Sequence, residues 1–144
     1  MNLSTHVTLS EFQNSPTATT HGINNKMSLS QIESAKLLCE NVFEPLRIHL
    51  NTPIQISSGF RSLQVNKMIG GASTSQHTKG EAMDIKVGAK GFNFIKDKLE
   101  FDQLIWEFGN DENPQWVHVS YSSRNRGQVL KANKKNGKTI YSNY

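Results

Sequence analysis

Apolar side chains follow a helical spacing early in the chain and an alternating spacing late in it. Residues 28–50 place apolar side chains three or four positions apart, and this spacing predicts one long helix. Ser30 and Glu33 fit a capping box near its start, and Pro45 indicates a kink or a break. From residue 82 onward, short apolar runs alternate with polar positions, which is typical of strands.

Several shorter segments complete the pattern. The predicted elements are a short extended segment and turn at 6–12, a surface loop to residue 25, strands at 53–62, 82–87, 101–109 and 115–121, short helices at 63–71 and 91–99, and a hairpin at 128–142. The run DENP predicts a turn between two strands, and Asn136-Gly137 predicts the turn of the hairpin. We therefore predict an α+β fold with an antiparallel sheet and helices packed on one side.

Size and cysteine content indicate one domain. The chain has 144 residues and no internal repeat or long linker, so we expect a single domain over 1–144. Within it, 1–27 is an N-terminal loop segment and 122–144 is a basic C-terminal hairpin or tail. The single cysteine, Cys39, excludes an internal disulfide and a cysteine-based zinc cluster. Its apolar position in the predicted helix favours packing over nucleophilic chemistry.

No segment has the composition of a leader or a membrane span. Residues 1–25 are polar, and no run approaches the roughly 18 apolar residues of a membrane-spanning helix. We therefore expect a chain that is made in the cytoplasm without a signal peptide and has no integral membrane association. Another agent would have to deliver it to a substrate outside the membrane.

The net charge of +4 is unevenly distributed. After His118 the chain has no acidic residue, and its basic residues are Arg124, Arg126, Lys131, Lys134, Lys135 and Lys138. This basic segment indicates attraction to a polyanion such as a cell-wall polymer or a membrane surface, but a solvated hairpin explains it equally well. No aromatic stacking platform accompanies these charges, so we do not expect nucleic acid as a partner.

Three polar residues occupy positions that packing alone does not explain. The run STSQHTKGEAMDI (73–85) contains His77 and Asp84, and QWVHVSY (115–121) contains His118. Strand alternation puts Asp84 and His118 opposite their apolar neighbours, which for either residue alone is the solvated face of a sheet. Together, two imidazoles and a carboxylate are a common ligand set for catalytic zinc, with the fourth position open to water.

The first of these runs also has a characteristic order. Gly80 and Ala82 remove bulk where the loop returns to its strand, which would let the histidine and the aspartate converge. The stretch from Ser75 to Asp84 resembles the S-x-H-x-x-G-x-A-x-D signature of the zinc D-Ala-D-Ala carboxypeptidase family, peptidase family M15, and the signature shared with the hedgehog fold. SSGFRS and WVHVSY are similar to the same family, in the same order. The likeness covers about residues 8–121, is closest to small phage and prophage members, and leaves the basic tail outside.

The resemblance implies roles for five residues. His77, Asp84 and His118 would be zinc ligands. Arg61, in SSGFRS, would hold a substrate carboxylate, because a guanidinium group can make two parallel hydrogen bonds to it. Ser75 would orient or hydrogen-bond the substrate. Without the resemblance, a surface salt bridge would explain Arg61 and a turn would explain Ser75.

One position departs from the family pattern. Several members place an acidic general base three residues before the last histidine, where this chain has Gln115, which cannot take a proton from water. We predict Glu107 as the catalytic base instead. If Phe108 pairs with Gln115, Glu107 faces Trp116 and is a diagonal neighbour of His118, about 7 Å away at the backbone. A slip of one residue would send Glu107 to the other face. The alternatives are two acidic residues of the turn, Asp111 and Glu112.

The resemblance implies a zinc-dependent peptidoglycan peptidase that cuts the cell-wall stem peptide, as a D-Ala-D-Ala carboxypeptidase or an endolysin-type endopeptidase encoded by a phage or prophage. Zinc would activate a water molecule, and Glu107 would take its proton. The enzyme would be a monomer that acts on the bacterial cell wall, released through a holin or carried in a virion. Loops 13–27 and 109–114 would set the length of the cleft. Two alternatives are a non-catalytic zinc-containing module that binds the cell wall or belongs to a virion, and a metal-free domain with a polyanion-binding tail.

Overall fold

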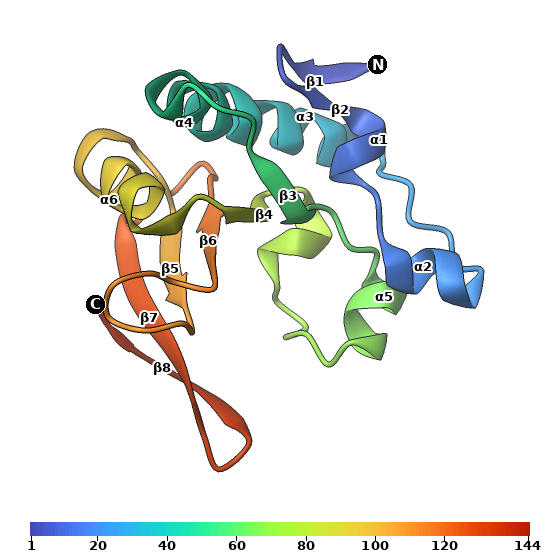
Figure 1. The fold of residues 1–144 in the computed structure, drawn as a ribbon. Coiled ribbons are helices and arrows are strands. Elements are labelled where there is room, and N and C mark those ends of the chain that lie inside the picture. Colours follow the sequence, from blue (N-terminus) through green and yellow to red (C-terminus); the bar gives the residue numbers. More distant parts are fainter.

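The computed structural model describes residues 1–144 and combines helices with a six-stranded sheet and a two-stranded N-terminal ribbon (Figure 1). The helical elements are α1 (Leu9–Phe12), α2 (Pro16–His21), α3 (Leu29–Leu38), the π-helical segment η1 (Cys39–Phe43), α4 (Glu44–Leu50), α5 (Leu63–Met68), the 3₁₀ turn η2 (Gln76–Lys79) and α6 (Gly88–Lys98). The strands are β1 (Asn2–Ser4), β2 (Val7–Thr8), β3 (Gln55–Ser58), β4 (Ala82–Lys86), β5 (Gln103–Glu107), β6 (Trp116–Ser120), β7 (Gln128–Lys135) and β8 (Lys138–Asn143).

The N-terminal segment is more structured than the sequence predicts. Residues 1–27, expected as a loop segment, contain the β1–β2 ribbon and the helices α1 and α2. Thr8 caps α1 in a capping box with Glu11, and Ser15 caps α2, which ends at the left-handed Gly22. Caps rather than apolar periodicity define these short helices, so hydrophobic spacing alone does not reveal them.

The predicted long helix over 28–50 is present as three consecutive segments, α3, η1 and α4. Ser28 caps it: its hydroxyl accepts a hydrogen bond from the backbone N–H of Gln31, and the Gln31 side chain accepts one from the backbone N–H of Ser28. The capping box predicted two residues further on is therefore wrong. Before Pro45 the helix widens to π-helical geometry and then continues, so the proline changes the local winding without ending the helix.

The sheet has the strand order β3-β4-β6-β5-β7-β8, and one of its pairs is parallel. In that pair, Gln103 of β5 faces Gln128 of β7 and Glu107 faces Ala132. The other pairs are antiparallel, so the α+β class is confirmed but the predicted antiparallel sheet is wrong. The parallel pair results from the path of the connection 121–127. This connection leaves the end of β6 and crosses the start of β5 to its other edge. β7 therefore begins beside the start of β5 and runs in the same direction.

The basic segment 122–144 contains the predicted hairpin, and this hairpin is the edge of the sheet (Figure 1). Lys135 and Lys138 pair across the turn, and the two residues between them, Asn136 and Gly137, both have left-handed φ angles of 52° and 75°. A two-residue turn of this kind matches the twist of the strands it joins. The segment thus contributes two strands to the six-stranded sheet.

The two faces of the sheet have different surroundings. One face packs against α3, η1, α4 and α6, and the strand residues in this core are Met83, Ile85, Leu104, Trp106, Val117 and Val119. Cys39 lies in the same core, where burial raises the pKa of its thiol to about 12. Asp84, Glu107 and His118 lie on the opposite face. None of the helices is both long and apolar enough to cross a membrane.

Candidate metal centre

His77, Asp84 and His118 converge on the sheet face opposite the helical core. Asp84 on β4 and His118 on β6 are paired neighbours, and His118 Nδ1 lies 3.0 Å from Asp84 Oδ1. His77 belongs to η2, and its Nε2 lies 3.4 Å from the same oxygen. One possible ligand atom from each residue lies within 4.8 Å of the other two. The structure thus brings together the three residues that the sequence indicates as metal ligands.

Backbone contacts fix the orientation of His77, which is only 2% exposed. Its Nδ1 lies 2.7 Å from the carbonyl oxygen of Gly59, so Nδ1 carries the proton and donates it. Gly59 lies against the backbone of Phe12, where a Cβ atom would not fit. Nε2 is therefore the lone-pair nitrogen, and it is directed at Asp84.

His77 and Asp84 face each other as two hydrogen-bond acceptors. Burial lowers the pKa of His77 against the opposing effect of Asp84, which favours a neutral imidazole. Burial disfavours the ionised form of Asp84, but opposing effects that include the hydrogen bond with His118 at 3.0 Å outweigh it, and the pKa of this carboxyl stays below its usual range. A neutral Nε2 and an ionised carboxylate in contact need a cation between them. The donor set of two imidazoles and one carboxylate therefore fits a divalent metal such as zinc.

The loop that carries His77 is held by its own caps. The Ser75 hydroxyl accepts a hydrogen bond from the backbone N–H of His77 at 3.3 Å, and the Ser75 carbonyl accepts one from the Thr78 hydroxyl at 2.7 Å. Gly80 ends the turn with a left-handed φ of 74° and lies against the backbone carbonyl of Gln31, where a Cβ would clash. The loop can therefore turn back into β4, as the sequence predicts for Gly80.

Glu107 lies on the same face, in the register that the sequence predicts. Glu107 pairs with Trp116 and Ile105 pairs with His118, so Glu107 and His118 are diagonal neighbours on β5 and β6. The residue is 7% exposed, and burial raises the pKa of its carboxyl to about 7, with His118 lowering it and Asp84 raising it. At neutral pH this carboxyl can therefore both accept and donate a proton.

Arg61 follows β3 and lies beside the loop of His77. Its backbone N–H donates to the His77 carbonyl at 3.1 Å, and its Nη2 lies 3.5 Å from the Ser75 hydroxyl. The guanidinium makes no salt bridge, and its buried Nε has no hydrogen-bond partner. Burial lowers the pKa of Arg61, and Asp84 opposes this effect. The surface salt bridge considered for Arg61 is therefore wrong, and its free donors suit an anionic ligand.

A small hollow of about 130 Å³ adjoins Arg61. Its lining comes from the start of α2 and from β3 with the residues after it, and includes Asn14, Ser15, Ser57, Ser58 and Phe60. A larger open hollow of about 360 Å³ lies within residues 10–26 and contains none of the candidate site residues. Of these two hollows, the smaller one has a candidate site residue, Arg61, in its lining.

The other acidic candidates lie elsewhere. Asp111 is in the exposed turn and pairs with Lys131 at 2.8 Å, and Glu112 and Gln115 are exposed as well. The three remaining histidines have partners outside the cluster: His6 pairs with Glu44, His21 contacts the Thr17 carbonyl, and His49 stacks on Phe94.

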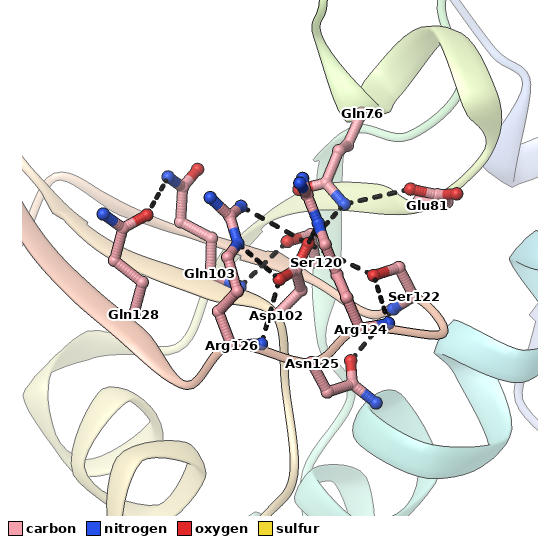
Figure 2. A network of polar contacts seen from close by, with 10 residues as sticks. All are labelled: Gln76, Glu81, Asp102, Gln103, Ser120, Ser122, Arg124, Asn125, Arg126 and Gln128. Atoms are coloured by element: carbon pink, nitrogen blue, oxygen red, sulfur yellow. Dashed lines mark hydrogen bonds and ion pairs between the residues drawn. The ribbon is translucent and has the colours of Figure 1, made fainter.

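A polar network next to the candidate centre does not follow from the motifs of the sequence (Figure 2). Gln76, the neighbour of His77, donates from Nε2 to Asp102 Oδ2 at 2.8 Å and to Glu81 Oε2 at 2.9 Å. Asp102 also accepts hydrogen bonds from Ser122, Arg124 and Arg126. An aspartate directly before an apolar strand was a signal in the sequence, but its partners follow only from the path of the connection 121–127.

The comparison with known proteins agrees with this arrangement. The Peptidase M15 family model matches residues 5–120, which include all six candidate site residues. A stretch of 40 residues is 48% identical to the zinc D-Ala-D-Ala carboxypeptidase of Streptomyces albus G, and this match covers 28% of the chain and only 16% of that protein. Because the family model covers most of the sequence, the chain belongs to peptidase family M15.

Proposed function

We propose that this protein is a zinc-dependent peptidase that hydrolyses a peptide bond in the stem peptide of peptidoglycan. The observation that carries this proposal is the convergence of His77, Asp84 and His118 beside a buried Glu107. Membership of a peptidase family supports hydrolysis of a peptide bond. The name of the Streptomyces relative supports zinc as the metal and a peptide ending in D-Ala-D-Ala as the class of substrate.

The proposed zinc ligands are His77 Nε2, Asp84 Oδ1 and His118 Nδ1. A zinc ion bound there would supply a Lewis acid, which polarises a carbonyl group and lowers the pKa of a water molecule. The Gly59 carbonyl keeps His77 in the tautomer whose Nε2 is free to bind. Asp84 contributes the negative charge that two neutral imidazoles lack.

Glu107 is the proposed general base. Its carboxylate would take a proton from the attacking water and pass it to the nitrogen of the leaving amine. The raised pKa of about 7 suits both steps, because a carboxyl with an ordinary pKa is a weaker base. Gln115 cannot take this role, since its amide does not titrate and its side chain is exposed.

Arg61 and Ser75 are the proposed substrate-binding residues. The paired N–H groups of Arg61 would hold a carboxylate of the peptide, and this would satisfy a guanidinium that has no acidic partner in the protein. The Ser75 hydroxyl would hold the guanidinium or donate to the same carboxylate. The hollow beside Arg61 would accommodate the residue on the leaving side of the cut bond.

Mass analysis of peptidoglycan fragments tests the proposal, with zinc content measured on each protein. Purified fragments would be incubated with the wild type, with Glu107→Gln and with Glu112→Gln, an exposed glutamate of the turn that serves as the matched control. We expect the wild type and Glu112→Gln to release the same product. Glu107→Gln should keep its zinc and lose about 100- to 10,000-fold in rate.

The product mass identifies the bond. Loss of one D-Ala would mean a carboxypeptidase, and a cut within the stem would mean an endopeptidase. A Glu107→Gln variant that keeps both zinc and full activity would contradict the role of Glu107.

The second candidate function is a zinc-containing module that binds the cell wall or belongs to a virion and has no catalytic activity. Gln115 favours it, because several family members place an acidic residue at this position. In that case the wild type would contain zinc and bind peptidoglycan in a pull-down assay but release no fragment. Fragment release by the wild type excludes it.

The finer points rest on the family resemblance. We propose a phage or prophage origin, a hedgehog/DD-peptidase-like fold and a monomeric protein. Release through a holin or transport in a virion would bring it to the cell wall. Light scattering of the purified protein tests the monomer, and lysis from within, with and without a pore-forming partner, tests the route to the wall.

A further inference from the structure

The C-terminal hairpin is held firmly against the strand that carries Glu107. β7 pairs with every residue of β5, from Gln103 to Glu107. The connection that leads into β7 is fixed by Arg126, whose Nε and backbone N–H donate to Asp102 Oδ1 at 2.7 and 3.0 Å (Figure 2). Asp102 is fully buried directly before β5. The hairpin is therefore positioned relative to the candidate site although it lies outside the region matched by the family model.

Two tyrosines of the hairpin lie on opposite faces of the sheet. Tyr144 packs on the helical side, with its ring centroid 4.8 Å from that of Phe92 and 6.0 Å from that of Trp106. Tyr141 is three residues earlier on an extended strand, so it points to the other face. That is the face of Glu107 and His118.

The register aligns Tyr141 with Glu107. Ala132 of β7 pairs with Glu107 on one side and with Tyr141 of β8 on the other. Ala132 is buried and its side chain is only a methyl group. The side chains of Glu107 and Tyr141 can therefore extend over it toward each other. Tyr141 is 55% exposed, and burial, Glu107 and Asp84 in that order raise the pKa of its phenol. Its ring is therefore close to the candidate site and still accessible to a ligand.

Four groups follow one another across this face in the order of the strands. Arg61 follows β3, the metal-ligating cluster joins η2, β4 and β6, Glu107 lies on β5, and Tyr141 lies on β8. Arg61 and Tyr141 are thus on opposite sides of the reacting centre. If Arg61 holds a carboxylate on the leaving side, the acyl side of the peptide extends over Glu107 toward Tyr141.

We propose that Tyr141 is a specificity residue that packs its ring against the acyl part of the stem peptide, about three residues from the cut bond. The distance follows from the sheet: two strand spacings of about 4.8 Å separate Glu107 from Tyr141, and an extended peptide advances about 3.3 Å per residue. The inference rests on the proposed peptidase function. The basic charges of the hairpin indicate a polyanion, whereas Tyr141 would give the hairpin an apolar contact with the substrate.

A ladder of synthetic stem peptides tests the proposal. The peptides carry one, two, three or four residues on the acyl side of the bond that the wild type cuts, and kcat and KM are measured for each with the zinc-loaded enzyme. The variants are Tyr141→Ala, Tyr141→Phe and Ile140→Ala. Ile140 is the matched control, because it is an exposed apolar neighbour on the opposite face of β8.

For the wild type we expect KM to fall when the third acyl-side residue is added. In Tyr141→Ala this fall should be lost, which raises KM for the longer peptides about 10-fold while kcat and the values for the shortest peptides stay unchanged. Tyr141→Phe should keep most of the effect, since the ring makes the contact, and Ile140→Ala should match the wild type.

Two outcomes would overturn the role of Tyr141. One is an unchanged dependence of KM on peptide length in Tyr141→Ala. The other is an equal loss for all lengths together with a lowered melting temperature, which would indicate a structural role. The proposed peptidase function fails separately: a wild type that contains zinc but releases no fragment from purified peptidoglycan would overturn it before any ladder is made.

Discussion

Asp84 in β4 and Asp102 directly before β5 are both largely shielded from water, with side-chain exposures of 16% and 0%, yet their surroundings differ. Asp102 accepts hydrogen bonds from two arginines, a glutamine and a serine, and its charge is neutralised within the protein (Figure 2). Asp84 faces two imidazoles, and one of them, His77, presents a lone pair to it. The charge of Asp84 is therefore matched only when a cation joins the cluster.

The comparison separates structural from functional polar groups. Both carboxyls have lowered pKa values, and in both cases the neighbouring groups outweigh the opposing effect of burial. A lowered pKa thus does not distinguish them. What distinguishes them is whether the protein itself supplies the donors: a completed network stabilises the fold, and an incomplete one marks a place for a ligand.

The largest effect should come from removing the charge of Asp84. We expect Asp84→Asn to lose zinc and to lower activity about 1,000-fold or more, because the metal would lose its only anionic ligand. The stability of the metal-free protein should change by less than about 1 kcal/mol, since an asparagine amide can donate to the lone pair of His77 Nε2 and its oxygen can still accept from His118. Zinc analysis and urea unfolding check both statements, with Asp111→Asn as the exposed control. Zinc bound at wild-type affinity would contradict the ligand assignment.

Asp102→Asn should have the opposite effect, with a loss of stability and no loss of zinc. Asparagine keeps only one acceptor oxygen and turns an NH2 group toward the other donors, so either Arg126 at Oδ1 or Gln76 at Oδ2 loses its acceptor and the arginines lose their buried counter-charge. We expect the free energy of unfolding to fall by about 3 kcal/mol. The folded variant should still bind one zinc ion, because Asp102 is not among the clustered ligands. Urea unfolding and zinc analysis of the folded fraction measure this. A variant that keeps its stability but loses zinc would place Asp102 in the metal site.

The contribution of Asp102 should also depend on pH. Its pKa is lowered in the folded state, so its stabilising effect is fully present above the unfolded value of about 3.9 and is lost as the pH falls below it. The difference in unfolding free energy between the wild type and Asp102→Asn should be constant from about pH 7 to pH 5 and shrink below about pH 4. Unfolding with a chelator present isolates this effect from zinc release. A constant difference down to pH 2 would exclude the ionic contribution.

We expect the smallest losses of unfolding free energy from replacing the two arginines, and the two losses should differ. Arg126 bonds to Asp102 with its backbone and two side-chain nitrogens, and Arg126→Ala should cost about 1–2 kcal/mol. Arg124 makes one side-chain bond and is more exposed, so Arg124→Ala should cost less than about 1 kcal/mol. Thermal unfolding of the two variants side by side decides the order. Equal losses of stability would mean that both arginines contribute equally to neutralising Asp102.

The sequence predicts much of the candidate site because its chemistry is local. His77 and Asp84 lie in one short run, and Gly80 between them provides the left-handed turn that joins the loop to β4. The alternation of β6 predicts the face of His118. The register of Glu107 is also accessible from sequence, since the turn between β5 and β6 limits how the two strands can pair.

The rest depends on contacts that local patterns do not encode. The helices of the first 27 residues are short and polar, so caps define them rather than periodicity. The parallel pairing of β5 with β7 depends on the path of the connection 121–127. That path is fixed by the hydrogen bonds between Arg126 and Asp102, which are 24 residues apart in the sequence. For the same reason, neither the Asp102 network nor the position of Tyr141 beside Glu107 could be predicted from residue spacing.

The parallel pairing also affects how the protein folds. β5 can pair with β6 as soon as the turn between them closes, but its other edge stays open until β7 docks. An open strand edge is a template for pairing with another chain. Until the C-terminal hairpin docks, the molecule is therefore most exposed to aggregation, and a protein shortened after residue 121 should scatter light during refolding at concentrations where the full chain stays clear.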